Sequence, residues 1–176
     1  MNWRDLAYLQ AGNVRQQRAY RALTDGDILT ALAPFDPVLI GTIPLQIDLP
    51  GSDLDLACCF AQDDVFIRHL RAHFQHRPDF ELKTKLLRSV PTVLVRFNAQ
   101  GFLVEIFGQP QPVDAQYGYR HMVVEHRILQ DRDEAFRNEI VRLKRTGLST
   151  EAAFAHLLGL SGDPYEALLQ WADATC

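Results

Sequence analysis

The order of helix and strand patterns along the chain predicts an α+β fold, with a small β-sheet of about five strands flanked by helices. Three observations support this prediction. Apolar residues at helical spacing open the chain, short apolar or alternating runs follow, and helical patterns return after Gln109-Pro110-Gln111-Pro112. With 176 residues, 47% of them hydrophobic, the chain is long enough to bury a substantial core.

Helices begin the chain and lead into the first predicted strands. Apolar side chains recur at helical spacing over residues 15–32, Gly26 divides this stretch into two helices, and Pro34 and Pro37 end it. The next predicted elements, in order, are a buried strand at 38–41, a loop at 42–52 that contains a short strand at 45–47, a strand at 54–60, and a helix at 63–76.

Three further strands are predicted in the middle of the chain. Residues 80–87 alternate between charged and less polar side chains, which indicates a strand with one solvated face. Residues 92–97 and 102–107 are expected to pair as a hairpin. Its turn would be Asn98-Ala99-Gln100-Gly101, because Asn and Gly favour turns.

The rest of the chain is predicted to be helical. We expect a single domain over residues 1–176, in which a core at 1–112 carries a helical C-terminal extension at 113–176 packed on it. Helical patterns run through residues 115–129 and 136–143, begin again at Ser149 after a C-cap at Gly147, and cover residues 164–172.

Charge and cysteine content narrow the class of protein. A formal net charge of −4 argues against a large nucleic-acid-binding surface. Cysteines number three and include the adjacent pair Cys58-Cys59, so they form no disulfide framework and indicate a reducing compartment. The N-terminus lacks the apolar core of a signal peptide, and no apolar stretch is long enough for a bilayer. We therefore expect a cytoplasmic protein without a membrane partner.

Several common kinds of catalytic site are absent from the sequence pattern. No Cys/His spacing typical of zinc is present, and Ser52 lacks the His and Asp partners of a hydrolase triad. His121 and His126 are five residues apart, which is a poor spacing for a metal pair on one helix. The histidines therefore predict no site.

Three acidic residues on two predicted strands are the strongest candidates for a functional site. Asp53 and Asp55 point to the same face, because alternate side chains of a strand do so, while Leu54 faces a core. Glu105 lies in an apolar run on another strand and would add a third carboxylate if that strand is adjacent. A pocket of carboxylate oxygens suits Mg²⁺ or Mn²⁺.

A glycine turn precedes the two aspartates. Gly41-Thr42 follows a buried strand, and its backbone N–H groups and the Thr42 hydroxyl can bind phosphate oxygens, since glycine lets phosphate approach closely. Nucleotidyl transfer needs a bound triphosphate, carboxylates that hold two metal ions, and a hydroxyl aimed at the α-phosphorus. The chain offers these parts, and Glu105 would complete the metal site or act as the base.

These motifs together resemble a known superfamily. Gly41-Thr42, ten further residues and then Asp53-Leu54-Asp55-Leu56 resemble the pattern of the polymerase-beta-like nucleotidyltransferases, in which Gly is followed by Gly or Ser and later by an Asp-x-Asp strand. Within it, the chain is similar to the domain-of-unknown-function 4269 family. The stretches that carry this similarity lie between about residues 38 and 129 and are Gly41-Thr42-Ile43-Pro44, Leu49-Pro50-Gly51-Ser52-Asp53-Leu54-Asp55, Val104-Glu105-Ile106-Phe107-Gly108-Gln109-Pro110 and Tyr119-Arg120-His121-Met122.

The resemblance implies a fold, a reaction and a set of site residues. The fold would be a small mixed sheet of nucleotidyltransferase type. Asp53, Asp55 and Glu105 would hold Mg²⁺ or Mn²⁺, and Gly41 and Thr42 would hold phosphate. The reaction would transfer a nucleoside monophosphate from a nucleoside triphosphate to an acceptor, with a small molecule or protein favoured over nucleic acid because no nucleic-acid-binding module is visible. Further candidates for binding nucleotide or phosphate are Ser52, Arg96 and Arg120.

The chain also departs from the superfamily pattern, and simpler explanations stay open. Thr42 replaces the more usual Ser, and Glu105 stands where many members have Asp. An Asp-x-Asp strand can be a solvated face. If the hairpin reverses at Ala99-Gln100, Glu105 lies opposite Leu94 and diagonal to Arg96, and an Arg96–Glu105 ion pair would explain Glu105 without a metal. The alternative functions are an inactive nucleotide-binding or protein-interaction module, or a metal-dependent nuclease or phosphohydrolase.

Overall fold

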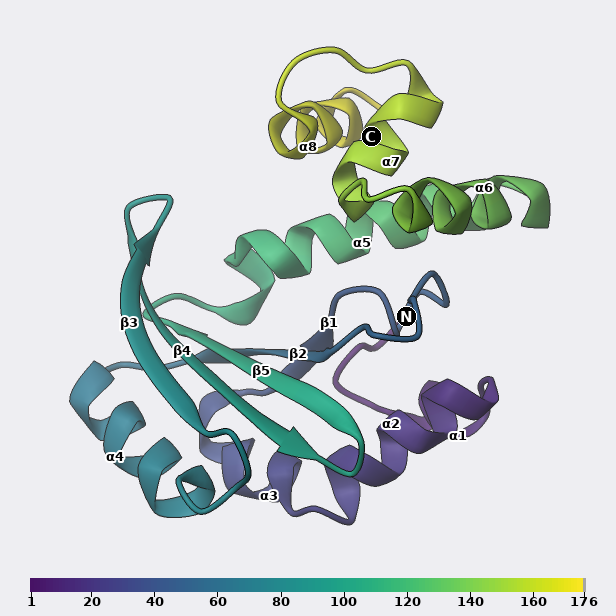
Figure 1. Cartoon of the computed structure of the whole chain (residues 1–176). Coiled ribbons are helices and arrows are strands. Elements are labelled where there is room, and N and C mark those ends of the chain that lie inside the picture. Colours follow the sequence, from purple (N-terminus) through teal and green to yellow (C-terminus); the bar gives the residue numbers. More distant parts are fainter. Residues whose placement is uncertain (176) are drawn as a thin grey trace.

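The computed structural model describes residues 1–175 as an α+β fold built on one five-stranded sheet (Figure 1). The strand order is β1-β2-β5-β4-β3, and the sheet is mixed because β2 and β5 run parallel while the other neighbours are antiparallel. This confirms the predicted fold class. The strands are β1 (Val38–Ile40), β2 (Leu54–Cys59), β3 (Glu81–Leu87), β4 (Val90–Ala99) and β5 (Phe102–Gln109).

Helices cover both faces of the sheet. In Figure 1, α1 to α4 lie on one side, α5 crosses the other side, and α6 to α8 stack beyond α5. None of the helices in residues 1–175 combines the length and apolar character needed to cross a membrane. The helices are α1 (Ala7–Gln10), α2 (Val14–Thr24), α3 (Ile28–Leu32), α4 (Asp63–Phe74), α5 (Tyr117–Gln130), α6 (Glu134–Arg145), α7 (Thr150–Leu158) and α8 (Pro164–Ala174), with short 3₁₀ turns η1 (Ala33–Phe35) and η2 (Val113–Ala115).

The sheet separates two apolar cores. Leu54, Leu56, Val104 and Ile106 point to one face and pack with residues of α2, α3 and α4. The other face contributes Ile40 and Ala57, which pack with residues of α5 to α8. Since side chains alternate along a strand, Asp55, between Leu54 and Leu56, and Glu105, between Val104 and Ile106, belong to this second face. The helix α5 covers only part of the sheet on this face.

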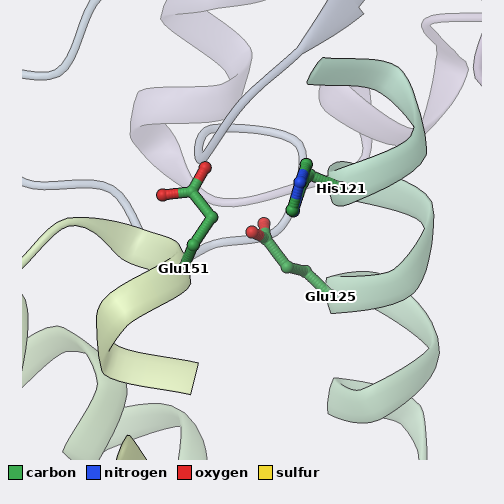
Figure 2. Close-up of side chains that lie close together, drawn as sticks. All are labelled: His121, Glu125 and Glu151. Carbon is green, nitrogen blue, oxygen red and sulfur yellow. The ribbon is translucent and has the colours of Figure 1, made fainter. Parts of the chain in front are cut away.

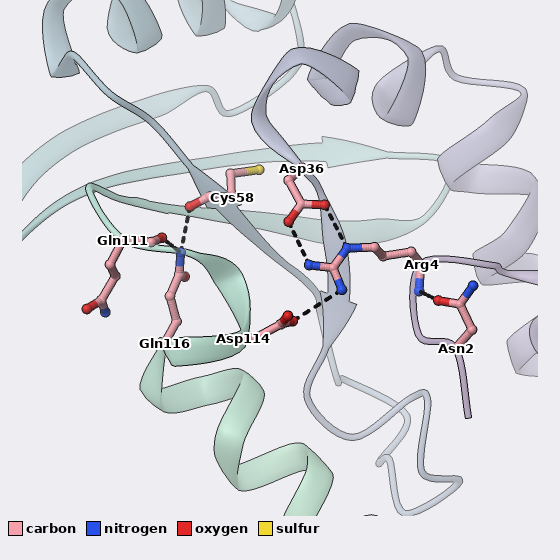
Figure 3. A network of polar contacts seen from close by, with 7 residues as sticks. All are labelled: Asn2, Arg4, Asp36, Cys58, Gln111, Asp114 and Gln116. Atoms are coloured by element: carbon pink, nitrogen blue, oxygen red, sulfur yellow. Dashed lines mark hydrogen bonds and ion pairs between the residues drawn. The ribbon is translucent and has the colours of Figure 1, made fainter.

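Polar contacts fix the start of α5 against the sheet (Figure 3). The Gln116 side chain donates a hydrogen bond of 2.8 Å to the backbone oxygen of Cys58 in β2. Arg4 lies between Asp36 and Asp114 and forms ion pairs of 2.7 Å and 3.1 Å with them. The N-terminal segment therefore bridges the end of η1, which precedes β1, and η2, which precedes α5.

Two local predictions were wrong. Residues 45 and 46 lie in a turn and Ile47 is in no strand, because the Thr42 carbonyl accepts hydrogen bonds from the N–H groups of both Leu45 and Ile47. The hairpin turn is tighter than expected: Ala99 pairs with Phe102, so only Gln100 and Gly101 remain in the turn, both with positive φ.

The helix boundaries predicted at Gly147 and Ser149 are confirmed. Gly147 has φ of +100° after α6, and the Ser149 hydroxyl accepts a hydrogen bond from the Ala152 N–H at the start of α7. The break at Gly26 between α2 and α3 is also confirmed. These local signals were reliable because each depends on residues close in sequence.

Candidate active site

A row of polar side chains crosses the sheet in one register. Asp55 of β2 is level with Glu105 of β5, Glu105 is level with Arg96 of β4, and Arg96 is level with Glu81 of β3. Residues at the same level of a sheet project to the same face, so the charges face the side partly covered by α5. Glu105 is therefore directly opposite Arg96, and the expected position opposite Leu94 was wrong, because the turn is Gln100-Gly101 and not Ala99-Gln100.

The three predicted carboxylates meet at one end of this row. Asp53 immediately precedes β2 and points to the same side as Asp55. One oxygen of each of Asp53, Asp55 and Glu105 lies within 4.8 Å of the others, a spacing that could hold a metal ion. Glu105 is buried, and the two aspartates are half-buried. Parallel pairing of β2 with β5 is what brings the third carboxylate beside the first two.

Arg96 forms an ion pair with Glu105, as one of the sequence hypotheses proposed. The Nε atom of Arg96 contacts Oε1 of Glu105. The Arg96 side chain is 44% exposed and the Glu105 side chain only 7% exposed, so the pair lies at the edge of the solvated face. The contact uses one carboxylate oxygen, which leaves the second oxygen of Glu105 for another partner. Ion pairing and carboxylate clustering therefore coexist at Glu105.

Burial and crowding of like charges disfavour ionisation in the cluster. Burial, together with the negative charges of Asp53 and Glu105, raises the pKa of Asp55 to about 8. Burial also raises the pKa of Glu105, although the hydrogen bond from Arg96 opposes this shift. In the described residues, Arg96 is the one cation that forms an ion pair with this trio. The site therefore has an excess of negative charge that a divalent cation would relieve.

The glycine turn lies against the cluster. Gly41 has φ of +80°, a conformation that glycine adopts without strain. A Cβ atom added to Gly41 would lie 2.5 Å from Oδ2 of Asp55, so the absent side chain gives this carboxylate its space. Thr42 and Ser52 lie beside the turn with their hydroxyl oxygens 3.5 Å apart. The structure thus brings Gly41, Thr42 and Ser52 to the carboxylates.

Replacing Gly41 by alanine should weaken both the fold and metal binding. The positive φ alone costs about 1–2 kcal/mol for a residue with a Cβ atom, and the methyl group would displace the Asp55 carboxylate. Urea unfolding and Mn²⁺ titration measure the two effects. Gly51→Ala is the matched control, because Gly51 lacks a positive φ and has no atom within 4 Å of an added Cβ. Equal Mn²⁺ affinity in Gly41→Ala and wild type would contradict this account of the turn.

Side chains far away in sequence hold the loop between Gly41 and Asp53. Arg15 of α2 forms an ion pair of 2.8 Å with Asp48 and donates a hydrogen bond of 2.7 Å to the backbone oxygen of Ser52. The buried Lys144 of α6 donates one of 2.7 Å to the backbone oxygen of Ile47. Sequence reasoning missed Arg15, Asp48 and Lys144, because each is an ordinary polar residue in its local pattern and no motif marks it.

The structure does not bring Arg120 to the carboxylates. Arg120 is exposed on α5 and lines a separate surface depression with Asp114 and Asp173. Lys83 and Lys85 are exposed on the edge strand β3, where Lys83 forms an ion pair of 2.7 Å with Glu81. These lysines therefore belong to the solvated strand face that the alternating pattern of residues 80–87 indicated.

A pocket of about 540 Å³ opens on the same face of the sheet. Ile40, which is level with Asp55, and Phe107, two residues after Glu105, form part of its floor. Tyr117 and Arg88 contribute a wall in which the guanidinium lies 4.1 Å from the centre of the tyrosine ring. None of the three carboxylates lines this pocket, but Ile40 and Phe107 place it next to them on the sheet, and it combines apolar surface with a few polar groups, as small-molecule sites do.

Solved structures with nucleotidyltransferase folds resemble the fold of this chain. The Cid1 poly(U) polymerase with bound MgGTP aligns over 73% of this chain and 41% of its own, with a TM-score of 0.54 and 15% identity. A structure of the GLD-2/RNP-8 complex aligns over 79% and 56%, with a TM-score of 0.54 and 17% identity. The polymerase core of TRAMP, an RNA surveillance complex, aligns over 93% and 50%, with a TM-score of 0.52 and 13% identity.

The fold therefore belongs to the nucleotidyltransferase-like class, as the sequence resemblance implied. The chain spans between 41% and 56% of the length of these three structures. A family model described as a domain of unknown function, DUF4269, matches residues 21–171. This chain is a member of the domain-of-unknown-function 4269 family, which its motifs also indicated. No curated protein matches it significantly.

Proposed function

We propose that this protein is a metal-dependent nucleotidyltransferase that moves a nucleoside monophosphate from a nucleoside triphosphate to an acceptor hydroxyl. The observation that carries the proposal is the meeting of Asp53, Asp55 and Glu105 beside the Gly41 turn. Strands β2 and β5 position Asp55 and Glu105, Asp53 immediately precedes β2, and the reaction needs carboxylates held on a rigid frame. The nucleotidyltransferase-like fold supports the proposal, although fold alone never determines a reaction.

The donor atoms fit Mg²⁺ or Mn²⁺. Asp53, Asp55 and Glu105 offer only carboxylate oxygens, which hard divalent cations prefer. Burial, together with the negative charges of Asp53 and Glu105, raises the pKa of Asp55, and the positive charge of a divalent cation would offset both effects. When bound, such a cation would neutralise charge on the triphosphate and on the reacting oxygens.

The residues of the chain have separate roles in this proposal. The backbone N–H groups of the Gly41 turn and the Thr42 hydroxyl bind phosphate oxygens, for which Thr42 would exchange its long hydrogen bond to the Ser52 hydroxyl for one to phosphate. Glu105 has one oxygen paired with Arg96, and its other oxygen completes the metal site or accepts the proton of the acceptor hydroxyl. Arg96, at the rim of the cluster, adds positive charge near the phosphates.

The pocket beside the cluster would receive the base and sugar of the nucleotide. Phe107 and Tyr117 offer aromatic surface for a base, and Arg88 and Glu166 offer polar groups. An acceptor would approach from the open side of the sheet over β4 and β5. A small molecule or a protein side chain is the favoured acceptor, because the formal net charge of −4 does not favour a nucleic acid.

One observation favours a binding module without turnover as the second candidate. The ion pair with Arg96 accounts for the buried Glu105 even in the absence of a cation. If Glu105 stays committed to Arg96, nucleotide could bind at Gly41 and Thr42 without reaction. Mn²⁺-dependent nucleotide binding without product release would identify this case.

Product analysis tests the proposal without a known acceptor. Slow transfer to water should release pyrophosphate and a nucleoside monophosphate when the protein is incubated with Mn²⁺ and each nucleoside triphosphate. Asp53→Asn should reduce this release at least about 100-fold, as expected for loss of a group that stabilises transition-state charge. Asp131→Asn, at an exposed position after α5, is the control and should keep wild-type rates. Release of orthophosphate in place of pyrophosphate would indicate a phosphohydrolase.

A further inference from the structure

A second group of potential metal ligands lies between α5 and α7, away from the sheet (Figure 2). His121 and Glu125 come from successive turns of α5, and Glu151 comes from the first turn of α7. One ligand atom of each residue lies within 4.8 Å of the others. Figure 2 shows His121 and Glu125 extending from α5 into the gap between the two helices, with the Glu151 side chain on the other side of this gap. Spacing of i and i+4 on a helix is suited to two ligands of one ion.

His121 is buried without a hydrogen-bond partner. Its side chain belongs to a residue that is only 3% exposed, and both ring nitrogens are buried with no partner among the described residues. The ring packs against Tyr117 and Tyr165. A buried polar atom left without a partner costs about 1–3 kcal/mol, so native structures almost always satisfy it. Both ring nitrogens of His121 are therefore available to a ligand that does not belong to the protein chain.

Glu125 is the second buried polar group of this cluster. Glu125 is 3% exposed and forms no ion pair in the described part of the chain. The nearest buried cation, Lys144, donates its hydrogen bond to the backbone oxygen of Ile47 in the loop that leads to the carboxylates of the sheet. A carboxylate in this position needs a charge partner or a proton. Glu151, at the half-buried edge of the cluster, adds a second carboxylate.

We propose that His121, Glu125 and Glu151 bind one divalent transition-metal cation, for which Zn²⁺ is the best match. An imidazole ligand favours Zn²⁺ and related ions over Mg²⁺ and Ca²⁺. One histidine and two carboxylates form a three-ligand set, the number that leaves a position for water in zinc sites. The two carboxylates balance the charge of the ion. This cluster is separate from Asp53, Asp55 and Glu105, so the proposal does not depend on the proposed function.

A bound ion would fasten α7 to α5. The first turn of α5 contributes Tyr117 and Gly118 to the pocket beside the carboxylates. Fixing α5 through His121 and Glu125 would therefore also stabilise one wall of that pocket. The competing explanation is a metal-free cluster in which Glu125 is neutral because it carries a proton.

Cobalt titration distinguishes these explanations. Asp53→Asn combined with Asp55→Asn removes the cluster of the sheet, and this background, freed of metal with EDTA, is titrated with Co²⁺ and Zn²⁺. We expect one equivalent of Co²⁺ to bind with visible absorption bands, one equivalent of Zn²⁺ to displace it, and Zn²⁺ to raise the unfolding temperature. A background protein that binds no equivalent of either ion would overturn the proposal.

Ligand variants in the same background locate the ion. Glu151→Gln is the main variant because Glu151 is half-buried and its replacement should preserve the fold; it should weaken Zn²⁺ binding at least about tenfold. His121→Gln should abolish the Co²⁺ bands. Glu134→Gln is the control, since Glu134 also occupies the first turn of a helix but is exposed. If Glu151→Gln and His121→Gln both retain wild-type Zn²⁺ affinity, the ion binds elsewhere and the assignment is wrong.

Discussion

Replacing Asp55 by asparagine should abolish nucleotidyl transfer and at the same time stabilise the protein in the absence of metal. The loss of activity, at least about 100-fold, follows from removal of a carboxylate that would hold the cation beside the reacting phosphate. The gain in stability follows from the burial of Asp55 and its crowding with Asp53 and Glu105, which together raise its pKa to about 8. An amide of similar shape is neutral and avoids this repulsion.

The raised pKa of Asp55 also determines how the stability of the protein should depend on pH. Because the folded-state pKa of Asp55 lies above the unfolded-state value near 3.8, the folded protein keeps a proton that the unfolded chain releases. In EDTA, the contribution of Asp55 to stability should be fully present below about pH 4, fall as the pH rises toward 8, and remain constant above that. Asp55→Asn should remove this fall and raise the unfolding temperature at pH 8 by a few degrees, given about 2–4 °C for each kcal/mol.

Thermal unfolding between pH 4 and pH 9, with and without Mn²⁺, measures both effects. Asp131→Asn serves as the control for loss of an exposed carboxylate. In wild type, Mn²⁺ should restore stability at pH 8, and in Asp55→Asn it should have little effect. A destabilised Asp55→Asn protein would mean that Asp55 has a structural role and would contradict its placement in a metal site.

Arg96→Leu should destabilise the protein because it leaves Glu105 buried without its ion-pair partner. Breaking a buried ion pair from one side costs about 3–5 kcal/mol. The 44% exposure of the Arg96 side chain lets water screen the pair, so we expect a smaller loss of about 1–3 kcal/mol. Urea unfolding in EDTA gives the change in the free energy of unfolding.

A second substitution separates charge from packing in this prediction. Arg96→Leu combined with Glu105→Gln should recover much of the stability, because no unpaired charge remains. Mn²⁺ should also stabilise Arg96→Leu more than wild type, since the cation can replace the lost positive charge. A neutral effect of Arg96→Leu would show that Glu105 does not depend on Arg96.

The fold was predictable from sequence wherever local patterns decide it. Helix boundaries were predicted correctly at Gly26, Gly147 and Ser149, because the backbone conformations and hydrogen bonds that begin or end a helix involve only residues a few positions away. Alternation along β2 placed Asp53 and Asp55 on one face. The hairpin register could not be predicted, because Ala99-Gln100 and Gln100-Gly101 are both plausible turns and the choice depends on strand pairing.

Contacts between distant segments account for what sequence patterns missed. Ile47 is apolar, as a strand residue would be, but it lies in a loop. Its backbone oxygen accepts a hydrogen bond from Lys144 of α6, and this contact holds the loop in place. His121 was discounted because its sequence neighbours offered no second histidine at helical spacing. Its potential partners are Glu125, four residues on, and Glu151, which only the packing of α7 on α5 brings close. A search for His and Glu at i and i+4 would have indicated the first of these pairs.

A crystal structure with Mn²⁺ and a non-hydrolysable nucleoside triphosphate analogue tests the central claim most directly. We predict anomalous density for Mn²⁺ bounded by Asp53, Asp55 and Glu105, with the phosphates of the analogue against Gly41 and Thr42 and its base in the adjoining pocket. Mn²⁺ density elsewhere, or an analogue bound away from the Gly41 turn with the carboxylates unliganded, would contradict the claim that these residues form a nucleotidyltransferase site.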